Sequence, residues 1–218
     1  FQSDAFSSNK RNLQSRKESH TEYRFELMQE LLNRNDALTP FKAAEIHIVS
    51  VNNEVKELLW VMHKRELSKP VIKTVNILQS DIQRFEGLFD GNAPEAPLSL
   101  PKKYLYEPNP AVMKSGLFAE VSQQTGTFKL HTNSHLYTSE ALTDFPGRRF
   151  EILQELPYSK KLIKKELTFK KANVTTRNFP KPVEVIRKEL KLADGGDHYL
   201  FFTTNMENEK IVLVCNKT

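Results

Sequence analysis

The stretch from residue 172 to residue 205 constrains the fold of this chain more than any other part of the sequence. It begins at 172–176 with a short segment containing β-branched residues, which is typical of a strand. Pro180 and Pro182 end this strand, because proline has no backbone N–H to donate to a sheet. Pro182 also stands where a helix would begin, and proline is well tolerated in the first helical turn. We therefore expect a strand that passes directly into a helix.

The second half of this stretch predicts the end of the helix and a return to the sheet. Val183, Ile186 and Leu190 recur at helical spacing, whereas lysine and arginine occupy much of the other side. Residues 194–197 (DGGD) should end the helix, because glycine adopts the positive φ of a C-cap at little cost. Residues 199–203 are typical of a second strand. A helix packed on strands, with cations near its edges, is a compact unit that could hold nucleic acid.

The remaining elements follow from hydrophobic periodicity and from turn residues. We expect a polar lead at 1–21, a helix at 22–33, an antiparallel hairpin at 46–62, a strand at 71–78, a long loop at 79–101, a strand at 103–107, a helix from 109 to about 124, a loop and short strand at 131–139, a brief helix starting at Ser139, a strand at 149–156, a helix at 160–167 and a last strand at 210–215. From residue 149 onward this order belongs to α+β folds whose helices cover one face of a sheet.

Composition limits the environments in which such a chain can work. The 218 residues carry a formal net charge of +5, which permits an anionic partner without requiring one. The single cysteine, Cys215, excludes an internal disulfide, and we expect it in the core of a cytoplasmic protein. No apolar run has the length of a membrane span. The chain opens with Phe1 rather than methionine, which indicates a processed or truncated product.

The motifs of common catalytic and cofactor sites are missing from the sequence. A dinucleotide enzyme or a class I methyltransferase needs a glycine-rich turn after its first strand, so that the backbone can approach the cofactor. None of the seven glycines forms a G-x-G or a P-loop. We therefore expect no complete nucleotide-cofactor site and no catalytic residues on this chain.

Two further motifs have simple structural explanations. Asn109 and Pro110 are similar to part of the loop with which amino-methyltransferases hold a target nitrogen, but a helix cap followed by proline explains both residues. His131 and His135 stand four residues apart, a spacing known from zinc sites, but no third ligand lies nearby in the sequence. We expect hydrogen-bonded loop histidines and no metal site.

Positive charge is concentrated after residue 159. Nine residues are candidate contacts for RNA: Lys160, Lys161, Lys164, Lys165, Lys170, Lys171, Arg177, Asn178 and Lys181. Two pairs of these lysines are spaced i, i+4, so that like charges repel on one side of a helix, and a phosphate-rich partner would relieve the repulsion. Arg177 is the strongest single candidate, because a guanidinium matches the geometry of phosphate. The alternative is a lysine face that is merely solvated.

Several runs of the sequence resemble one family. ANVTTRNFP and, after the helix, LKLADGGDHYLFFTT resemble the carboxy-terminal THUMP-like domain of a bacterial group of class I SAM-dependent methyltransferase-like proteins. YLYEPNPAVMKSGLF, LHTNSHLYTS and DFPGRRF resemble the small ferredoxin-like insert that precedes this domain in the same proteins. IHIVSVNNEVKELLWVM resembles the last strand hairpin of their methyltransferase domain. The resemblance covers about residues 45–218.

This resemblance implies an α+β chain of four parts. They are a lead segment with one helix at 1–45, the end of an α/β methyltransferase sheet with a linker at 46–100, a ferredoxin-like insert at 101–148 and a THUMP-like domain at 149–218. The SAM-binding part of the family should precede residue 46, where the sequence is too short to hold it. The resemblance thus implies the back half of a methyltransferase, with S-adenosylmethionine as cofactor of a full-length relative and RNA, tRNA among the candidates, as substrate.

Three functions remain open from the sequence. The first is a substrate-binding module that holds RNA through its backbone phosphates. The second is a methyltransferase with a degenerate SAM site around the hairpin at 46–62. The third is a structural module in which an exposed apolar edge at 46–51 pairs with a second copy to form a homodimer. Binding of SAM would distinguish the second hypothesis, and light scattering would distinguish the third.

Overall fold

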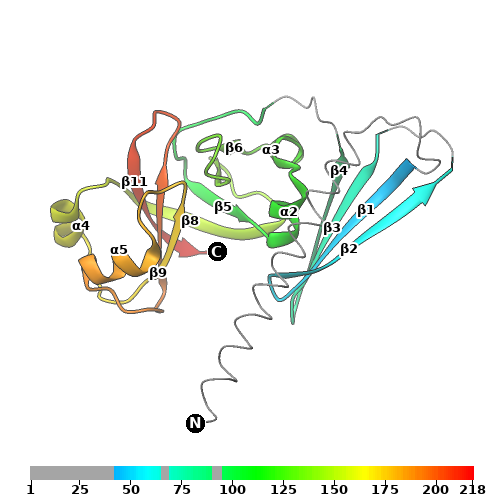
Figure 1. The fold of residues 1–218 in the computed structure, drawn as a ribbon. Helices are drawn as coiled ribbons and strands as arrows, with labels where there is room; N and C mark the ends of the chain where they lie inside the picture. Colours follow the sequence, from blue (N-terminus) through cyan, green and yellow to red (C-terminus); the bar gives the residue numbers. More distant parts are fainter. Residues whose placement is uncertain (1–41, 65–68, 90–94) are drawn as a thin grey trace, which may run out of the picture. The chain divides into compact units, whose positions relative to one another are not determined.

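The computed structural model describes residues 42–64, 69–89 and 95–218. The chain divides into two compact units, one made of residues 1–44 and 62–68 and the other of residues 45–61 and 69–218. Most of the first unit, including the helix predicted at 22–33, lies outside the described residues. Apart from the ends of two strands, all elements described below belong to the second unit. Figure 1 shows these elements with their labels.

A four-stranded sheet begins the described chain. Its strands are β1 (Lys42–Val51), β2 (Glu54–His63), β3 (Val71–Ile77) and β4 (Ile82–Leu88), in the order β2-β1-β3-β4. β1 and β2 form the predicted hairpin, and Asn52 and Asn53 take the positive φ values, 50° and 61°, that suit a two-residue turn. β4 lies inside the loop predicted at 79–101, so that prediction was wrong. β4 pairs with β3 along its whole length, and this pairing overrides the weak strand propensity of its glutamine, glutamate and glycine.

The order of this sheet contradicts the exposed edge expected at 46–51. These residues belong to β1, which is an inner strand between β2 and β3. Ile46 and Ile48 are fully buried. The edges of the described sheet are β2 and β4, so residues 46–51 have no free backbone row for a second copy to pair with.

A seven-stranded sheet contains the rest of the chain. Its strands are β5 (Tyr104–Pro108), β6 (Phe128–Lys129), β7 (Tyr137–Ser139), β8 (Gly147–Pro157), β9 (Asn173–Arg177), β10 (His198–Thr204) and β11 (Lys210–Lys217), in the order β6-β7-β5-β8-β11-β10-β9. β9 and β10 are parallel and are joined through a helix, as the stretch at 172–205 predicted. β8 pairs with β5 on one side and with β11 on the other, so both halves of the region share one sheet.

Alternate residues of the central strands face two different cores. Leu200 and Phe202 on β10 pack with the helices α4 (Lys160–Glu166) and α5 (Val183–Leu190), which lie together in Figure 1. Phe201, between them, faces the opposite side and packs with Phe150 of β8. Cys215 lies in this second core, as expected. The period of two along β10 and β11 therefore follows the two buried faces of the sheet.

The loop at 130–136 covers the second core and brings distant strands together. Leu130 and Leu136 pack against Phe201 and Leu213, although β6 and β7 stand at the far end of the strand order. The sheet must therefore curl, because side chains on strands that are not neighbours come into contact across its concave face. This curl positions the polar residues of the site described below.

Two predictions between β5 and β8 require correction. The helix expected from 109 to about 124 is two helices, α2 (Pro110–Ser115) and α3 (Phe118–Thr125), because Gly116 ends the first with a φ of 73°. The side chain of Asn109 accepts a hydrogen bond from the N–H of Val112, so its role as a cap is confirmed. The brief helix expected at Ser139 is absent, since Ser139 ends β7 and its hydroxyl bonds to Tyr106.

The end of α5 also differs from the prediction. Lys191, with a φ of 57°, caps the helix, and residues 194–197 lie in the turn that follows. The backbone of Ala193 bonds to Lys170 and Ala172, which draws the chain out of the helix before it reaches the glycines. Gly195 and Gly196 still adopt positive φ values of 92° and 85° in that turn. Backbone pairing, rather than glycine, thus sets the end of the helix.

A buried amide network joins the two sheets inside the second unit. Gln83 of β4 donates a hydrogen bond to the carbonyl of Gly147 at 3.1 Å. Its side-chain oxygen accepts from Asn109 at 3.2 Å and from Asn76 at 3.3 Å. Because polar groups buried at such a contact must be satisfied, this network holds the start of β8 in place.

Candidate nucleic-acid interface

Four of the predicted RNA contacts lie on α4. The helix begins at Ser159, whose hydroxyl accepts a hydrogen bond from the N–H of Leu162 at 3.4 Å. Ile163 is fully buried in the core and anchors the helix. Because the core side of the helix is taken by apolar residues, the lysines of α4 point to solvent.

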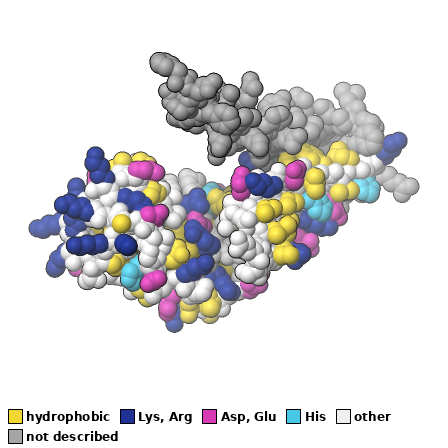
Figure 2. Space-filling view, turned by 90° about the horizontal axis from the view of Figure 1, so that it is seen from below, with side chains coloured by type: hydrophobic (Ala, Val, Ile, Leu, Met, Phe, Trp, Pro, Cys, Tyr) yellow, Lys and Arg dark blue, Asp and Glu magenta, His cyan; other side chains and the backbone are white. Residues whose placement is uncertain are grey.

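Six lysines of this region have exposed ammonium groups. We call Lys160, Lys161, Lys164, Lys165, Lys170 and Lys171 the lysine surface. None of them forms an ion pair with a residue in the described part of the chain. Figure 2 shows lysine and arginine side chains gathered at the end of the unit that carries α4. Lys164 and Lys165 lie in the last turn, where the helix dipole favours cations and offsets part of their repulsion.

Lys181, although predicted in the same group, is engaged inside the protein. Its ammonium donates to both carboxylate oxygens of Glu189, at 3.0 and 2.9 Å, and lies 5.5 Å from the centre of the Tyr158 ring. The hydrogen bond to Tyr158, followed by that to Glu189, raises the pKa of Lys181 above its ordinary value. An RNA phosphate would have to compete with these contacts.

Arg177 is held by a buried carboxylate on a distant strand. Its Nη2 and Nε donate to Oε1 of Glu107 at 2.7 and 3.1 Å. Arg148 donates to the other oxygen, Oε2, through Nε at 2.8 Å and also through Nη2. Glu107 is only 4% exposed, whereas the two arginine side chains are 37% and 42% exposed. We call these three residues the arginine pair and its carboxylate.

Asn178 follows Arg177 at the end of β9 and is not part of the lysine surface. Its side-chain amide bonds to Nδ1 of His131 at 3.1 Å, and Nε2 of His131 bonds to Asn208 at 3.2 Å. Asn178 has a φ of 50°, a left-handed conformation that asparagine tolerates. The nine predicted contacts therefore separate into the lysine surface, the engaged Lys181, and the pair Arg177 and Asn178.

The two loop histidines have different surroundings. No group of three or more metal-ligating side chains occurs among the described residues. His135 stacks on the ring of Phe118 with centroids 4.0 Å apart. Burial, together with the charges of Lys129 and Arg177, lowers the pKa of His135 to about 4. His135 is therefore a neutral side chain at neutral pH.

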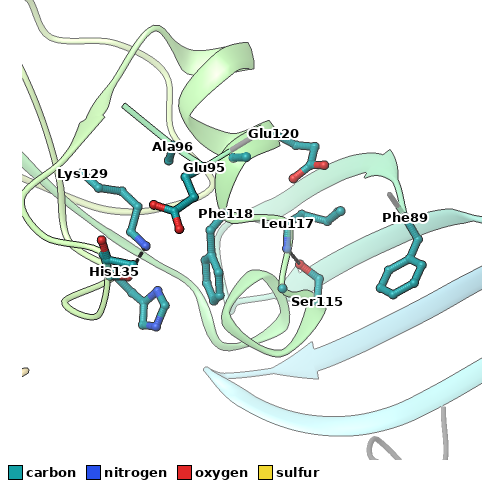
Figure 3. A pocket seen from close by; sticks show the side chains of 12 residues that line it. Phe89, Glu95, Ala96, Ser115, Leu117, Phe118, Glu120, Lys129 and His135 are labelled. Atoms are coloured by element: carbon teal, nitrogen blue, oxygen red, sulfur yellow. Dashed lines mark hydrogen bonds between the residues drawn. The ribbon is translucent and has the colours of Figure 1, made fainter. Parts of the chain in front are cut away.

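A cavity of about 280 Å³ lies beside α3 (Figure 3). Lys129 lines it and is 5% exposed; its ammonium donates to the carbonyl of Thr132 at 2.5 Å and lies 5.2 Å from the centre of the Phe118 ring. Burial lowers the pKa of Lys129. Glu95 and Glu120 also line the cavity, so its charges favour neither an anion nor a cation. Nothing in the short run around Lys129 distinguishes it as a cavity residue in the sequence.

The described part of the chain shows no activated nucleophile around these groups. Cys215 is buried, and its burial raises the pKa of the thiol, so that the reactive thiolate is disfavoured. No described helix is both long enough and apolar enough to cross a bilayer. The polar groups that this region presents are cations and hydrogen-bond donors.

Comparison with known proteins supports the resemblance found in the sequence. Residues 104–146 match the family model of a ferredoxin-like domain, and residues 147–217 match that of a THUMP domain-like family. No curated protein is a match. The chain is similar to a solved structure from Porphyromonas gingivalis W83 named as a "putative methyltransferase", at 34% sequence identity and a TM-score of 0.77.

That similarity covers 86% of this chain but 48% of the solved one, so this chain spans about half the length of the protein it matches. The boundary between the two matched domains falls at the start of β8, between Pro146 and Gly147. Glu107 lies in the first domain, and Arg148 and Arg177 lie in the second. This is an α+β chain that carries a ferredoxin-like domain followed by a THUMP-like domain.

Proposed function

We propose that this chain is the RNA-binding portion of a methyltransferase-like protein. The observation that carries the proposal is the lysine surface of the THUMP-like domain. Its ammonium groups are exposed and have no carboxylate partner among the described residues. A cluster of unpaired cations binds nucleic acid mainly through phosphates, with release of counterions. The name of the THUMP-like match and the concentration of charge point to the same kind of partner.

Four lysines of α4 provide the direct test. We expect the full chain to bind bulk tRNA in a filter assay, with affinity that falls steeply between about 50 and 200 mM salt. Reversing Lys160, Lys161, Lys164 and Lys165 to glutamate should remove most of the binding and make the salt slope less negative by about 3. An affinity that does not respond to salt or to these reversals would contradict the proposal.

A matched control separates this surface from the general positive charge of the protein. The double variant Lys161→Glu with Lys165→Glu changes the same charge as Lys102→Glu with Lys103→Glu, which lie just before the ferredoxin-like domain. We expect the first pair to weaken binding about tenfold more than the second, because only the first faces the proposed RNA. Equal effects would indicate long-range attraction alone.

The RNA class is the finer part of the proposal, and we propose tRNA. Duplex RNA of the same length as the tRNA provides the comparison in the same assay. Preference for tRNA supports this choice, and equal affinity for both removes it while leaving RNA binding intact.

A second candidate function is methyl transfer, favoured by the similarity to the Porphyromonas gingivalis protein. Against it, the sequence has no G-x-G turn of the kind with which a class I methyltransferase holds SAM. We propose that the chain alone does not hold SAM. Titration calorimetry checks this, since binding heat with SAM alone would establish a degenerate site and revive the enzyme hypothesis.

A further inference from the structure

The arginine pair and its carboxylate join the two domains by charge. Glu107 comes from β5 of the ferredoxin-like domain, and both arginines come from the THUMP-like domain. The two guanidiniums donate hydrogen bonds to different carboxylate oxygens: Arg148 to Oε2 and Arg177 to Oε1. β5 and β9 are separated by three strands in the sheet order, so the curl of the sheet alone creates this contact.

The cluster carries more positive charge than its structural role needs. One arginine would neutralise the carboxylate, but two are present, so one positive charge is left over. Each guanidinium turns its Nε and Nη2 toward Glu107 and makes no further side-chain hydrogen bond with a described residue. The ring of Phe150 lies 5.5 Å from Arg148 and supports it. The remaining N–H groups belong to side chains that are 42% and 37% exposed and can reach solvent.

The residues on either side of Arg177 line a hollow, but Arg177 itself does not. A hollow of about 520 Å³ lies at the end of β9, lined by Thr176, Asn178, Phe179, Pro180 and Lys210. The ammonium of Lys210 donates to Thr204 at 2.8 Å. Thr203, which pairs with Arg177 in the β9–β10 register, is fully buried, and its hydroxyl has no partner within the described chain. One buried hydroxyl without a partner in the described chain, that of Thr203, therefore lies on the strand next to Arg177.

We propose that Arg148 and Arg177, held in place by Glu107, form a phosphate-binding site for the RNA backbone at the boundary between the two domains. The site is distinct from the lysine surface, and it rests on the proposed RNA-binding function. The buried carboxylate fixes both guanidiniums before RNA arrives, so little side-chain freedom is lost on binding. The geometry gives this role to Arg148, which the charge pattern of the sequence does not single out.

Methionine substitutions test the site, since methionine keeps much of the side-chain volume and removes the charge. The probes are bulk tRNA and a mixed-sequence oligoribonucleotide of about 16 nucleotides. Arg148→Met and Arg177→Met should each weaken binding by the full chain about tenfold and reduce the steepness of the salt slope by about 0.7. Arg149→Met is the matched control, because Arg149 is the adjacent residue on β8 and does not contact Glu107. Its effect should be much smaller.

Conservative variants separate a phosphate site from a purely structural ion pair. Lysine at both positions keeps the charge but lacks the planar arrangement of donors, so binding should weaken while the salt slope stays unchanged. Glu107→Gln removes a negative charge, and simple electrostatics would then increase RNA affinity. We expect a several-fold decrease instead, because the guanidiniums lose the group that positions them. An increase would overturn the positioning role.

The outcomes distinguish this inference from the function on which it rests. If the unmodified chain binds neither RNA probe, the proposed function fails and the inference fails with it. If the unmodified chain binds and the α4 reversals weaken it, but Arg148→Met and Arg177→Met behave like Arg149→Met, the inference alone is overturned. If a methionine variant does not fold, judged by circular dichroism, the double lysine variant decides, and unchanged affinity there rejects the site.

Discussion

The lysine surface and the arginine pair are two basic regions of one domain, and they are built in different ways. The lysine surface comes from residues close together in the sequence, displayed by one short helix and the loop after it. The arginine pair comes from β8 and β9, and its carboxylate comes from β5; β5 pairs directly with β8, but Arg177 on β9 reaches Glu107 only because the sheet curls. A local run of charge thus produces exposed, flexible cations, whereas tertiary contact produces cations that are already oriented.

The difference matters for what each region can recognise. A lysine ammonium is a strongly hydrated point charge on a flexible chain, so a lysine surface attracts phosphates with little geometric demand. A guanidinium fixed by a carboxylate presents its donors in one direction, so it binds only a phosphate that lies at one position. We infer that the first region supplies attraction and the second supplies position.

The largest loss of stability is expected from Gly147→Ala, at the start of β8 and next to Arg148. A Cβ there would lie 2.1 Å from the carbonyl oxygen of Glu107 and 2.8 Å from Cα of Pro108, so β5 and β8 would be forced apart. We expect a loss of about 3 kcal/mol in the free energy of unfolding, measured with urea. Gly195→Ala is the control, because its φ of 92° is strained but no atom lies within 4 Å of the new Cβ. A smaller loss at Gly147 than at Gly195 would contradict the close approach of the strands.

A smaller loss of stability is expected on acidification. It concerns His135, whose pKa is lowered in part by the charge of Arg177. Folding lowers the pKa of His135 from 6.5 to about 4. As the pH falls, this imidazole is therefore protonated in the unfolded chain before it is protonated in the folded one. The stability that this residue contributes is complete above about pH 6.5 and is lost as the pH falls toward 4, with a change of about 3 kcal/mol.

His135→Phe keeps a ring for stacking on Phe118 and cannot titrate. Urea unfolding at about pH 7 and about pH 4.5 should show a weaker pH dependence for this variant than for the unmodified chain. Identical pH dependence in the two proteins would show that His135 is protonated at its ordinary pKa in the folded state.

The smallest expected effect lies at the start of α4. Ser159→Ala removes the hydroxyl that accepts from Leu162, which should cost about 1 kcal/mol in the free energy of unfolding. Ser159→Asp restores an acceptor and serves as the control. Because the lysine surface depends on local helix formation, RNA affinity should follow this loss, whereas the contacts of the arginine pair should remain unchanged. A loss of RNA affinity with no loss of stability would break this connection.

The lysine surface could be predicted from the sequence, whereas the contacts of the arginine pair could not, and the reasons are physical. α4, its cap and its exposed lysines follow from periodicity and composition within one segment, and the structure has them as predicted. Arg177 was named from its charge, but its contact with Glu107 depends on a residue 70 positions away. Arg148 and Lys129 carry no local signal, because the contact of Arg148 with Glu107 comes from the pairing of β8 with β5 and the role of Lys129 comes from a cavity.

The failed element predictions have the same origin. β4 has weak strand propensity and exists through its pairing with β3, and α5 ends early because Ala193 pairs with residues 170 and 172. The sequence by itself determined the strand–helix–strand stretch and the position of the lysine surface, because these depend on neighbouring residues. Only the tertiary structure decided which strand pairs with which and which arginines share Glu107, because contacts between distant residues leave no periodic trace along the chain.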